Sequence, residues 1–514
     1  MIWIWIMVSC RSHPEKENCT GLDADGDGFT LEEGDCNDLN PAIYPNAEDV
    51  CDGLDNDCDG FTDDGENCAL YTADANIHFF SDPDQPMGSG GVLGDITGDG
   101  ELDMVANSFL VGEGFVGESK VHIFAGPFSE QQSTADSQLQ LELGDLDRGS
   151  VHNMFTDFNG DGQLDLLVAS AANSQGGDQA GAVYLLLGPI VENQDLEDEY
   201  SMLWIGSEGD WAGHSIADLG DVNGDGRSDI LIGAYEYNTD VVEGGAAYIL
   251  FGQEEVSGDM AMLSNSDVIL IGDEDENLGY EVSAAGDLNG DGFRDLAINA
   301  YRYDTANRNA GRTFVFFGPI DEALTMSQAD LYIDGYEEIG QQGSTLASLP
   351  DIDGDGNDDL LVSSQYGDAS LSSQMTGDHG TAYIVTNIQN TDIVLSDVNN
   401  KIVGVQTEEN FGREGKGLGD LNEDGFGEVL ITSKRFGVDF VEQGRMSLFY
   451  GPIEGSYTSS QADTLIYGSN EEAWAGLSLD LYGQGEQGQL LIGSRQISDG
   501  VIYGESHLFF LQDF

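Results

Sequence analysis

Residues 221–235 read DVNGDGRSDILIGAY, and five other stretches repeat this arrangement of an acidic, glycine-containing turn followed by an apolar strand. The other turns are DITGDGELD, DFNGDGQLD, DLNGDGFRD, DIDGDGNDD and DLNEDGFGE, which begin at residues 95, 157, 287, 351 and 420. Successive turns are therefore 62, 64, 66, 64 and 69 residues apart. Repeats of this length, each with several short strands, are typical of the blades of a β-propeller.

Apolar runs bounded by glycine and aspartate predict the strands of each blade. The strand after the turn recurs seven times, as DMVAN, DLLVA, DILIG, DLAIN, DLLVS, EVLIT and, without an acidic turn, QLLIG. The strand that ends a repeat also recurs seven times, from VHIFAGP to HLFFLQD. No segment has a sustained helical period. The sequence predicts an all-β fold, a seven-bladed propeller of four-stranded blades.

The ends of the repeat region predict how the ring closes. HLFFLQD has no outer strand after it, whereas ANIHFF (75–80) precedes the first repeat and aligns with the outer strands of the others. We expect ANIHFF to complete the last blade, because closure hides edges that could pair with other chains. The predicted parts are a signal segment at 1–9, a linker at 10–18, a Cys- and Asp-rich module at 19–68 and the propeller at 75–514.

The six acidic turns carry oxygen atoms at the alternating positions that Ca²⁺ requires. Positions 1, 3, 5 and 9 supply side-chain oxygens, position 7 supplies a backbone carbonyl, and glycines permit the tight turn. A solvated acidic turn is the alternative. We expect about six Ca²⁺ ions in the propeller. The candidate ligands are Asp95, Thr97, Asp99, Glu101 and Asp103; Asp157, Asn159, Asp161, Gln163 and Asp165; Asp221, Asn223, Asp225, Arg227 and Asp229; Asp287, Asn289, Asp291, Phe293 and Asp295; Asp351, Asp353, Asp355, Asn357 and Asp359; and Asp420, Asn422, Asp424, Phe426 and Glu428.

The turns are not expected to bind equally. The turn at residue 351 has Asp at all four side-chain positions and should bind most strongly, whereas Glu423 replaces a glycine in the sixth turn and should weaken it. The seventh repeat has Leu481 and Tyr482 after Asp480, and we expect no ion there. The predicted role is structural, because each ion would join carboxylates that otherwise repel one another.

The N-terminal region predicts export and a small stapled module. MIWIWIMVSC resembles the lipobox of a bacterial lipoprotein, in which Cys10 is lipidated; an ordinary signal peptide is the alternative. The protein would be secreted or at the cell surface, as an outer-membrane lipoprotein, with a lipid as its only membrane attachment. Five cysteines, an odd number, lie between residues 19 and 68, and they indicate disulfides in an oxidising compartment. They are Cys19, Cys36, Cys51, Cys58 and Cys68.

Two further acidic turns in this module offer one or two Ca²⁺ sites. In the first turn, Leu31 stands at position 9, so the last ligand would be Glu33 or Asp35. The candidate ligands are Asp23, Asp25 and Asp27 in that turn, and Asp55, Asp57, Asp59, Phe61 and Asp63 in the second.

The repeats resemble a known family. An apolar residue before a glycine, an acidic turn and a small-residue turn after the next strand are similar to the FG-GAP repeats of integrin α-chain propellers. The glycine signatures are Met87-Gly88, Leu278-Gly279, Ile339-Gly340, Phe411-Gly412, Trp211-Ala-Gly213 and Trp474-Ala-Gly476. The module at 19–68 resembles the MopE-type metal-binding motif of bacterial surface proteins, a name associated with copper. Its all-carboxylate ligands favour Ca²⁺ instead. These resemblances imply a calcium-binding propeller of a cell surface, with a role in adhesion.

Charge limits the partners. The chain has 96 Asp and Glu against 16 Lys and Arg, a formal net charge of −80, which repels nucleic acid and anionic lipid. The scarce cations gather in the loops between the second and third strands, beside tyrosines, and this face is predicted to bind an anionic ligand. Packing of Tyr235, Tyr301 and Tyr366 between blades is the alternative. The candidate ligand-binding residues are Tyr235, Tyr237, Tyr301, Arg302, Tyr303, Arg308, Tyr366, Arg435 and Arg495.

Two functions follow from these observations. The first is a monomeric surface module that binds a protein or glycan. The second is a polysaccharide-processing, lyase-like enzyme that uses the central face of the propeller. HExxH, GxSxG and P-loop motifs are absent from the sequence, so the first function is preferred.

Overall fold

The computed structural model describes most of the propeller and single positions nearer the N-terminus. The described residues are 29, 30, 36, 43–45, 47, 58, 70–80, 87–108, 119–143, 151–237, 244–273, 276–320, 324–337, 340–367, 379–389, 391–438, 441–483, 488–498 and 501–511. The chain divides into two compact units, residues 1–70 with 460–466 and residues 71–459 with 467–514.

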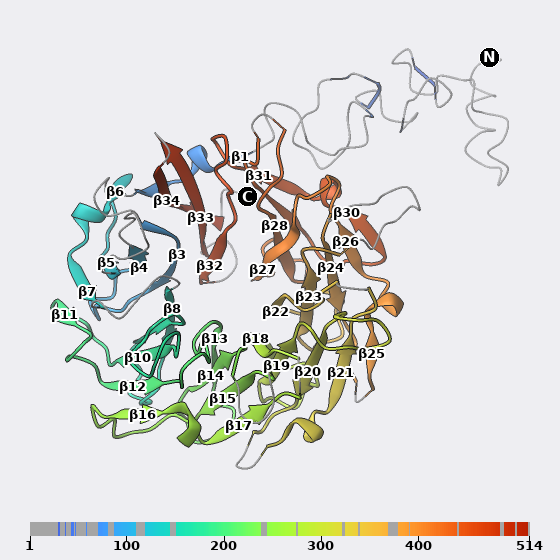
Figure 1. Cartoon of the computed structure of the whole chain (residues 1–514). Helices are drawn as coiled ribbons and strands as arrows, with labels where there is room; N and C mark the ends of the chain where they lie inside the picture. The colour runs from blue at the N-terminus through green and yellow to red at the C-terminus, as the bar shows by residue number, and fades with distance from the viewer. Residues whose placement is uncertain are drawn as a thin grey trace, which may run out of the picture. The chain divides into compact units, whose positions relative to one another are not determined.

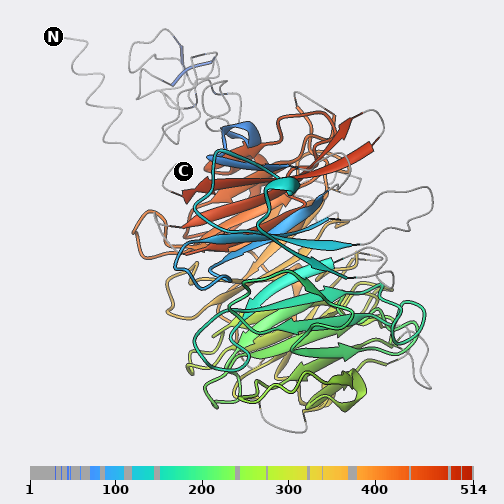
Figure 2. The ribbon, with the colours of Figure 1, turned by 90° about the vertical axis from the view of Figure 1, so that its left-hand side faces the viewer.

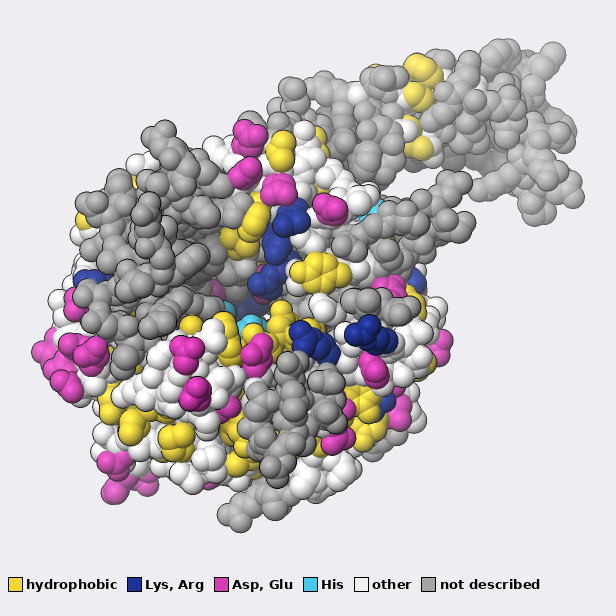
Figure 3. Space-filling model, in the orientation of Figure 1, with side chains coloured by type: hydrophobic (Ala, Val, Ile, Leu, Met, Phe, Trp, Pro, Cys, Tyr) yellow, Lys and Arg dark blue, Asp and Glu magenta, His cyan; other side chains and the backbone are white. Residues whose placement is uncertain are grey.

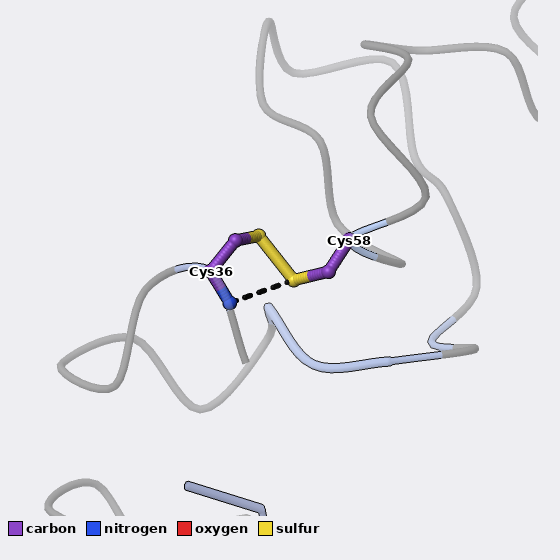
Figure 4. The surroundings of a disulfide bond; sticks show 2 residues. All are labelled: Cys36 and Cys58. Carbon is purple, nitrogen blue, oxygen red and sulfur yellow. Dashed lines mark hydrogen bonds between the residues drawn. A yellow bond between two sulfur atoms is a disulfide. The ribbon is translucent and has the colours of Figure 1, made fainter. Parts of the chain in front are cut away.

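In the first unit, a disulfide joins Cys36 to Cys58 (Figure 4). The backbone N–H of Cys36 lies 3.0 Å from Cys58 Sγ. The sequence predicted disulfides in this region but did not predict their pairing. The observed disulfide joins two cysteines that are 22 positions apart in the sequence. The predicted lipidation site Cys10 and the candidate ligands Asp23, Asp25, Asp27, Asp55, Asp57, Asp59, Phe61 and Asp63 lie outside the described residues.

Seven antiparallel sheets form a ring, which confirms the predicted seven-bladed propeller (Figure 1). In each blade the strands follow one another from the ring axis outward. Blades 1 to 4 are β3 (Met87–Gly94), β4 (Asp103–Ser108), β5 (Lys120–Phe124) and β7 (Leu139–Glu142); β8 (Val151–Thr156), β9 (Asp165–Ser170), β10 (Ala182–Leu186) and β12 (Met202–Ile205); β13 (Ile216–Gly220), β14 (Asp229–Ala234), β15 (Ala246–Leu250) and β17 (Val268–Ile271); and β18 (Leu278–Gly286), β19 (Asp295–Ala300), β20 (Arg312–Phe316) and β21 (Leu331–Asp334).

The remaining blades continue the pattern around the ring. They are β22 (Thr345–Leu349), β23 (Asp359–Ser364), β24 (Thr381–Val385) and β26 (Lys401–Val403); β27 (Phe411–Gly419), β28 (Glu428–Ser433), β29 (Arg445–Phe449) and β31 (Thr464–Tyr467); and β32 (Ser478–Tyr482), β33 (Gln489–Ser498), β34 (Val501–Phe510) and β2 (Ile77–Phe80). The strands run through the thickness of the ring, between its two faces (Figure 2).

Most sheets have a fifth strand that the sequence did not predict. The segment between the third and outer strands of one repeat first runs parallel to the outer strand of the preceding blade, as β6 does beside β2. It thereby covers an edge that would otherwise be exposed. These strands are β6 (Gln131–Ser133), β11 (Gln194–Asp195), β16 (Met260–Met262), β25 (Ile393–Val394) and β30 (Ser456–Thr458). In the sheet of blade 6, the short strand β1 (Leu70–Tyr71) lies next to β31.

Single 3₁₀ turns connect several of these short strands to the outer strands. They are η3 (Thr72–Asp74), η4 (Thr134–Asp136), η5 (Leu263–Asn265), η6 (Met326–Gln328), η7 (Leu395–Asp397) and η8 (Ser459–Gln461). In the described part of the chain, no helix is both long and apolar enough to cross a membrane.

The second strands are buried on both sides because each blade packs between two others. All six residues of β14 are buried, which explains why the five residues after Asp229, ILIGA, contain no alternating polar residue. Leu231 and Ile249 of blade 3 lie in one apolar cluster with Leu296 and Phe314 of blade 4. The core of the propeller is therefore a set of interfaces between blades.

One glycine signature differs from the sequence prediction. Gly213, Gly279 and Gly476 have φ values of +85°, +84° and +84°, and the corresponding residue of blade 5 is Gly343 at +87°. The N–H of Gly343 donates to the carbonyl of Ser363, as that of Gly213 does to Gly233. The assignment to Ile339-Gly340 was wrong by three residues, because Gln342 replaces the apolar residue that marks the other copies.

The ring closes through β2, which pairs with β34 and places His78 directly opposite His507. The two Nδ1 atoms are 3.1 Å apart, and His507 Nε2 lies 2.8 Å from Ser494 Oγ and 3.7 Å from the Glu505 carboxylate. Burial lowers the pKa of both imidazoles, that of His507 to about 3, although Asp74 opposes the shift at His78. Since a hydrogen bond between two Nδ1 atoms needs one of them unprotonated, protonating both rings would break it.

We therefore expect mild acid to weaken the closing pair. A histidine with a lowered folded pKa takes up its proton first in the unfolded state, so stability falls as the pH drops below about 6.5. His78→Gln copies Gln140, which stands opposite His122 in blade 1. In urea unfolding at pH 7 and 4.5, wild type should lose more of its free energy of unfolding than this variant does. An equal loss in both proteins would contradict this account of the pair.

Candidate functional site

The first residue of each acidic turn organises the turn. Asp221 Oδ1 accepts the N–H groups of Gly224 and Asp225, at 2.6 and 2.9 Å, and its Oδ2 accepts that of Gly226 at 2.8 Å. Asp351 accepts the corresponding N–H groups at 2.6, 3.1 and 2.8 Å. A carboxylate that accepts three backbone N–H groups fixes the turn before any ion binds.

The residue at position 7 ends the turn before the second strand. In all six turns its N–H donates to the position-5 carboxylate, as Arg227 donates to Asp225 at 3.0 Å. The other five are Glu101, Gln163, Phe293, Asn357 and Phe426. The structure thus gives the six predicted turns one backbone plan, held by the carboxylates at positions 1 and 5.

The position-9 carboxylate begins the second strand of each blade and is at most 1% exposed in all six. Asp229 Oδ2 accepts the N–H of Val222 inside the turn, and its Oδ1 accepts the N–H of Gly252 after the third strand. Asp103, Asp165 and Asp295 make the equivalent pair of bonds. One buried side chain therefore joins the turn to two strands.

Burial of these carboxylates disfavours their charged form. It raises the pKa of Asp165 to about 6, of Asp229 and Asp295 to about 7, and of Asp359 to about 8, and nearby turn carboxylates add to the increase in all four. A cation at the turn centre would reverse the shift, because an opposite charge favours the ionised carboxylate.

The oxygen donors fit a hard divalent cation. Carboxylate oxygens of Asp351, Asp353 and Asp359 lie within 4.8 Å of one another, as do those of Asp420, Asp424 and Glu428. In the second turn, Asp157 Oδ1 is buried without a hydrogen-bond partner among the described residues. Ligand sets of carboxylate, amide and carbonyl oxygen suit Ca²⁺, which tolerates six to eight ligands in irregular geometry.

The turns are also bonded to one another around the ring, which sequence reasoning missed. The position-8 N–H of one turn donates to the position-1 carbonyl of the preceding turn in three places. The pairs are Ser228 with Asp157 at 3.0 Å, Asp358 with Asp287 at 3.1 Å and Gly427 with Asp351 at 2.7 Å. Since these are backbone bonds, only the equal spacing of the repeats could have indicated them.

The seventh blade differs at the corresponding stretch. Asp480 lies inside β32 instead of at the head of a turn. It accepts the N–H of Leu93 and lies 3.2 Å from Lys416 Nζ. This aspartate therefore joins blade 7 to blades 1 and 6.

The predicted ligand-binding residues lie at the opposite face, where Lys and Arg gather around the axis (Figure 3). Tyr301 is 8% exposed and Tyr366 is 42% exposed, and Arg302 lies 5.2 Å from the centre of the Tyr301 ring. Tyr237 packs against Tyr248, and Tyr303 against Phe314, so both belong to the apolar clusters between blades. Arg308 is exposed, and the side chain of Arg495 lies outside the described residues.

Several cations of this face are already engaged. Arg445 is 1% exposed, stacks on Phe436 at 3.6 Å and bonds Ser459, which bonds Glu409. Arg312 forms a two-pronged ion pair with Asp334, with N–O distances of 2.5 and 2.8 Å. Arg435 lies 3.8 Å from Glu442. These residues support the fold, which leaves less positive charge for a ligand than their number indicates.

Sequence reasoning missed a group of residues at the axis. His214, Tyr280 and Arg413 each follow the positive-φ glycine near the start of an innermost strand, and Glu281 and Glu414 come next in two of the blades. Burial and the neighbouring Glu414 raise the pKa of Glu281 to about 8, and Arg413 opposes this. The glycine signature itself could have found them, because the residue after it begins the strand that lines the axis.

Comparison with protein families agrees with this architecture. A family model for the "FG-GAP repeat" matches residues 215–250, 278–316 and 342–385, and one for the "FG-GAP-like repeat" matches residues 157–232. A model described as "Putative metal-binding motif", of the MopE type, matches residues 35–64. The chain thus carries FG-GAP repeats in its propeller and a metal-binding motif before it.

Known proteins with similar stretches include integrin α chains. Integrin alpha pat-2 of Caenorhabditis elegans is 30% identical over 264 residues, 48% of this chain and 21% of the relative. Integrin alpha-3 of Cricetulus griseus is 29% identical over 205 residues, 38% of this chain and 18% of the relative. Phosphatidylinositol-glycan-specific phospholipase D of Rattus norvegicus is 29% identical over 226 residues, which are 41% of this chain and 26% of the relative. The chain thus matches about a quarter or less of each relative's length.

The sixth turn allows a test of the turn geometry. Position 4 has φ between +72° and +80° in the first five turns, where it is glycine, and +60° at Glu423. Because a non-glycine residue costs about 1 kcal/mol in this region, Glu423→Gly should raise the free energy of unfolding by roughly that amount. Glu423→Ala is the control, since it removes the charge but keeps the strained backbone. Equal effects of both variants, by urea unfolding, would show that charge and not backbone strain matters here.

Proposed function

We propose that the protein is a calcium-stabilised, extracellular binding module of the adhesion type, which binds a protein or glycan. The observation that carries the proposal is the set of six turns with one backbone plan, each closed by a buried carboxylate. The similarity to integrin α chains and to a metal-binding motif supports both the calcium and the surface location. A lipid on Cys10 would hold it at an outer membrane.

The proposed division of labour is between the two faces of the ring. Calcium would fix the face that carries the acidic turns, because each ion would balance carboxylates that burial otherwise drives toward the neutral form. Ligand would bind on the other face, where the loops between second and third strands and the axial residues lie. Binding sites formed by loops on a rigid scaffold are common in folds of this kind.

Removal of calcium should therefore destabilise the propeller. We expect EDTA to lower the melting temperature by on the order of 10 °C, since several sites each contribute about 2.7 kcal/mol at a hundredfold excess of ion over its dissociation constant. Ca²⁺ should restore the loss better than Mg²⁺, which demands a stricter octahedral geometry. A melting temperature that EDTA leaves unchanged would overturn the structural role of calcium.

A single turn can be tested against a matched control. Asp351→Asn weakens the turn with the most acidic ligands and should remove one bound Ca²⁺ per chain, counted by elemental analysis after dialysis. Asp397→Asn removes the same charge from η7 of the same blade, outside any turn, and should leave the count unchanged. Equal counts in both variants would show that the turn at residue 351 holds no ion.

Ligand binding can be tested on arrays of glycans and of extracellular-matrix proteins, with and without Ca²⁺. Binding that depends on Ca²⁺ and releases no product is the expected result. Release of shortened or unsaturated oligosaccharides would instead support the polysaccharide-processing enzyme. An absence of binding to either array would overturn the adhesion proposal.

A further inference from the structure

Aromatic rings from two neighbouring blades form a continuous wall at the axis. The His214 ring lies 4.6 Å from that of Tyr235 and 4.9 Å from that of Tyr280, between centroids. Tyr280 is in turn 5.5 Å from Tyr235 and 4.3 Å from Tyr301. The residues come from the start of the innermost strands and the end of the second strands. They therefore all lie at the face opposite the acidic turns.

Charged groups from blade 4 and from blade 6 meet beside this wall. Arg413 of β27 lies 2.7 Å from the carboxylate of Glu414, and it acts on the pKa values of His214, Tyr280 and Glu281. Three blades thus contribute to one place, although these residues are up to 199 positions apart (from 214 to 413) in the sequence. We call His214, Tyr235, Tyr280, Glu281, Tyr301 and Arg413 the axial mouth.

Water reaches the axial mouth. His152, at the start of β8, is exposed although it lies on an innermost strand, and Tyr280 and Glu281 are only half-buried. The side chains of Arg413 and Glu414 are 35% and 30% exposed to solvent. The groups at the axis are thus open to solvent, and a ligand could reach them from the face opposite the acidic turns.

The charges at the axial mouth nearly cancel. Arg413 is paired with Glu414 at 2.7 Å, and the partial burial of Glu281 close to Glu414 raises the pKa of the Glu281 carboxyl, which disfavours its charged form. The positive guanidinium disfavours a cationic ligand here. The chain's net charge of −80 disfavours an anionic one over the whole surface. The axial mouth therefore suits a ligand without charge.

Flat aromatic faces beside fixed polar groups also restrict the shape of that ligand. An apolar side chain would cover the rings but would leave the guanidinium and carboxyl groups without partners, which is costly. A pyranose ring has C–H faces that stack on tyrosine and hydroxyl edges that exchange hydrogen bonds with carboxyl, guanidinium and phenol groups. A pyranose therefore matches both the aromatic rings and the polar groups beside them, whereas an apolar ligand matches only the rings.

We propose that the axial mouth binds a neutral pyranose unit of a glycan, an inference that rests on the proposed function and names its ligand class. Tyr280 supplies the central stacking face, because it contacts the other three rings of the wall. Arg413 and Glu281 bind the hydroxyl edge. The arginines farther out on this face, Arg302 and Arg435, are not required.

The probes are methyl glycosides of glucose, galactose, mannose and fucose, with glucuronate and galacturonate as their acidic counterparts. In saturating Ca²⁺, saturation-transfer NMR should show contact with the ring C–H protons of at least one neutral sugar and with neither uronate. Tyr280→Leu should weaken that binding about tenfold or more, as expected for the loss of a stacking face. Tyr457→Leu, which removes a ring from β30 outside the axial mouth, is the matched control.

Glu281→Gln gives a second variant that keeps the size of the side chain, in case Tyr280→Leu lowers the melting temperature. It should weaken binding about threefold or more, because it replaces a hydroxyl-binding carboxyl by an amide. No contact with any neutral sugar, equal contact with the uronates, or full binding by both variants would overturn the inference. Array binding to a protein or an acidic glycan would then leave the proposed function standing, whereas no array binding at all would remove both.

Discussion

The buried carboxylate at position 9 of each turn is the interaction on which the rest of the propeller depends. It holds the turn through one oxygen and, in the first four turns, the end of the third strand through the other. A buried carboxylate without a counter-charge is costly, so the arrangement that fixes each blade also creates the need for a cation. If the proposed ions bind, the same six carboxylates serve both the fold and the metal sites.

The two faces of the ring differ in how closely the blades repeat one another. The face with the acidic turns is repetitive, and its backbone plan varies little from blade to blade. The other face breaks the repeat, since the residue after the glycine signature is His214 in blade 3, Tyr280 in blade 4 and Arg413 in blade 6. Recognition of a particular ligand needs an asymmetric set of groups, and the blades differ in this way only on the face without the acidic turns, where the proposed calcium sites would not restrict the residue type.

The repeat made much of this structure predictable. The spacing of the turns and the apolar runs between them determined the blade count, the strand order within a blade and the likeness to FG-GAP repeats. The fifth strands were not predicted, because a parallel pair such as β6 with β2 leaves no hydrophobic pattern in so short a segment. The axial residues were missed for a related reason. Tyr280 and Arg413 are 133 positions apart (from 280 to 413), and only closure of the ring brings them together.

The hydrogen bonds between neighbouring turns have a consequence for how calcium would act. Where Ser228, Asp358 and Gly427 donate to the turn before them, ordering one turn also orders part of the next. An ion that binds at one position would then lower the entropic cost of binding at its neighbour, which is positive cooperativity without a change of shape. The ring would fill with calcium over a narrow range of concentration, so its rigidity would follow a threshold in the surrounding medium.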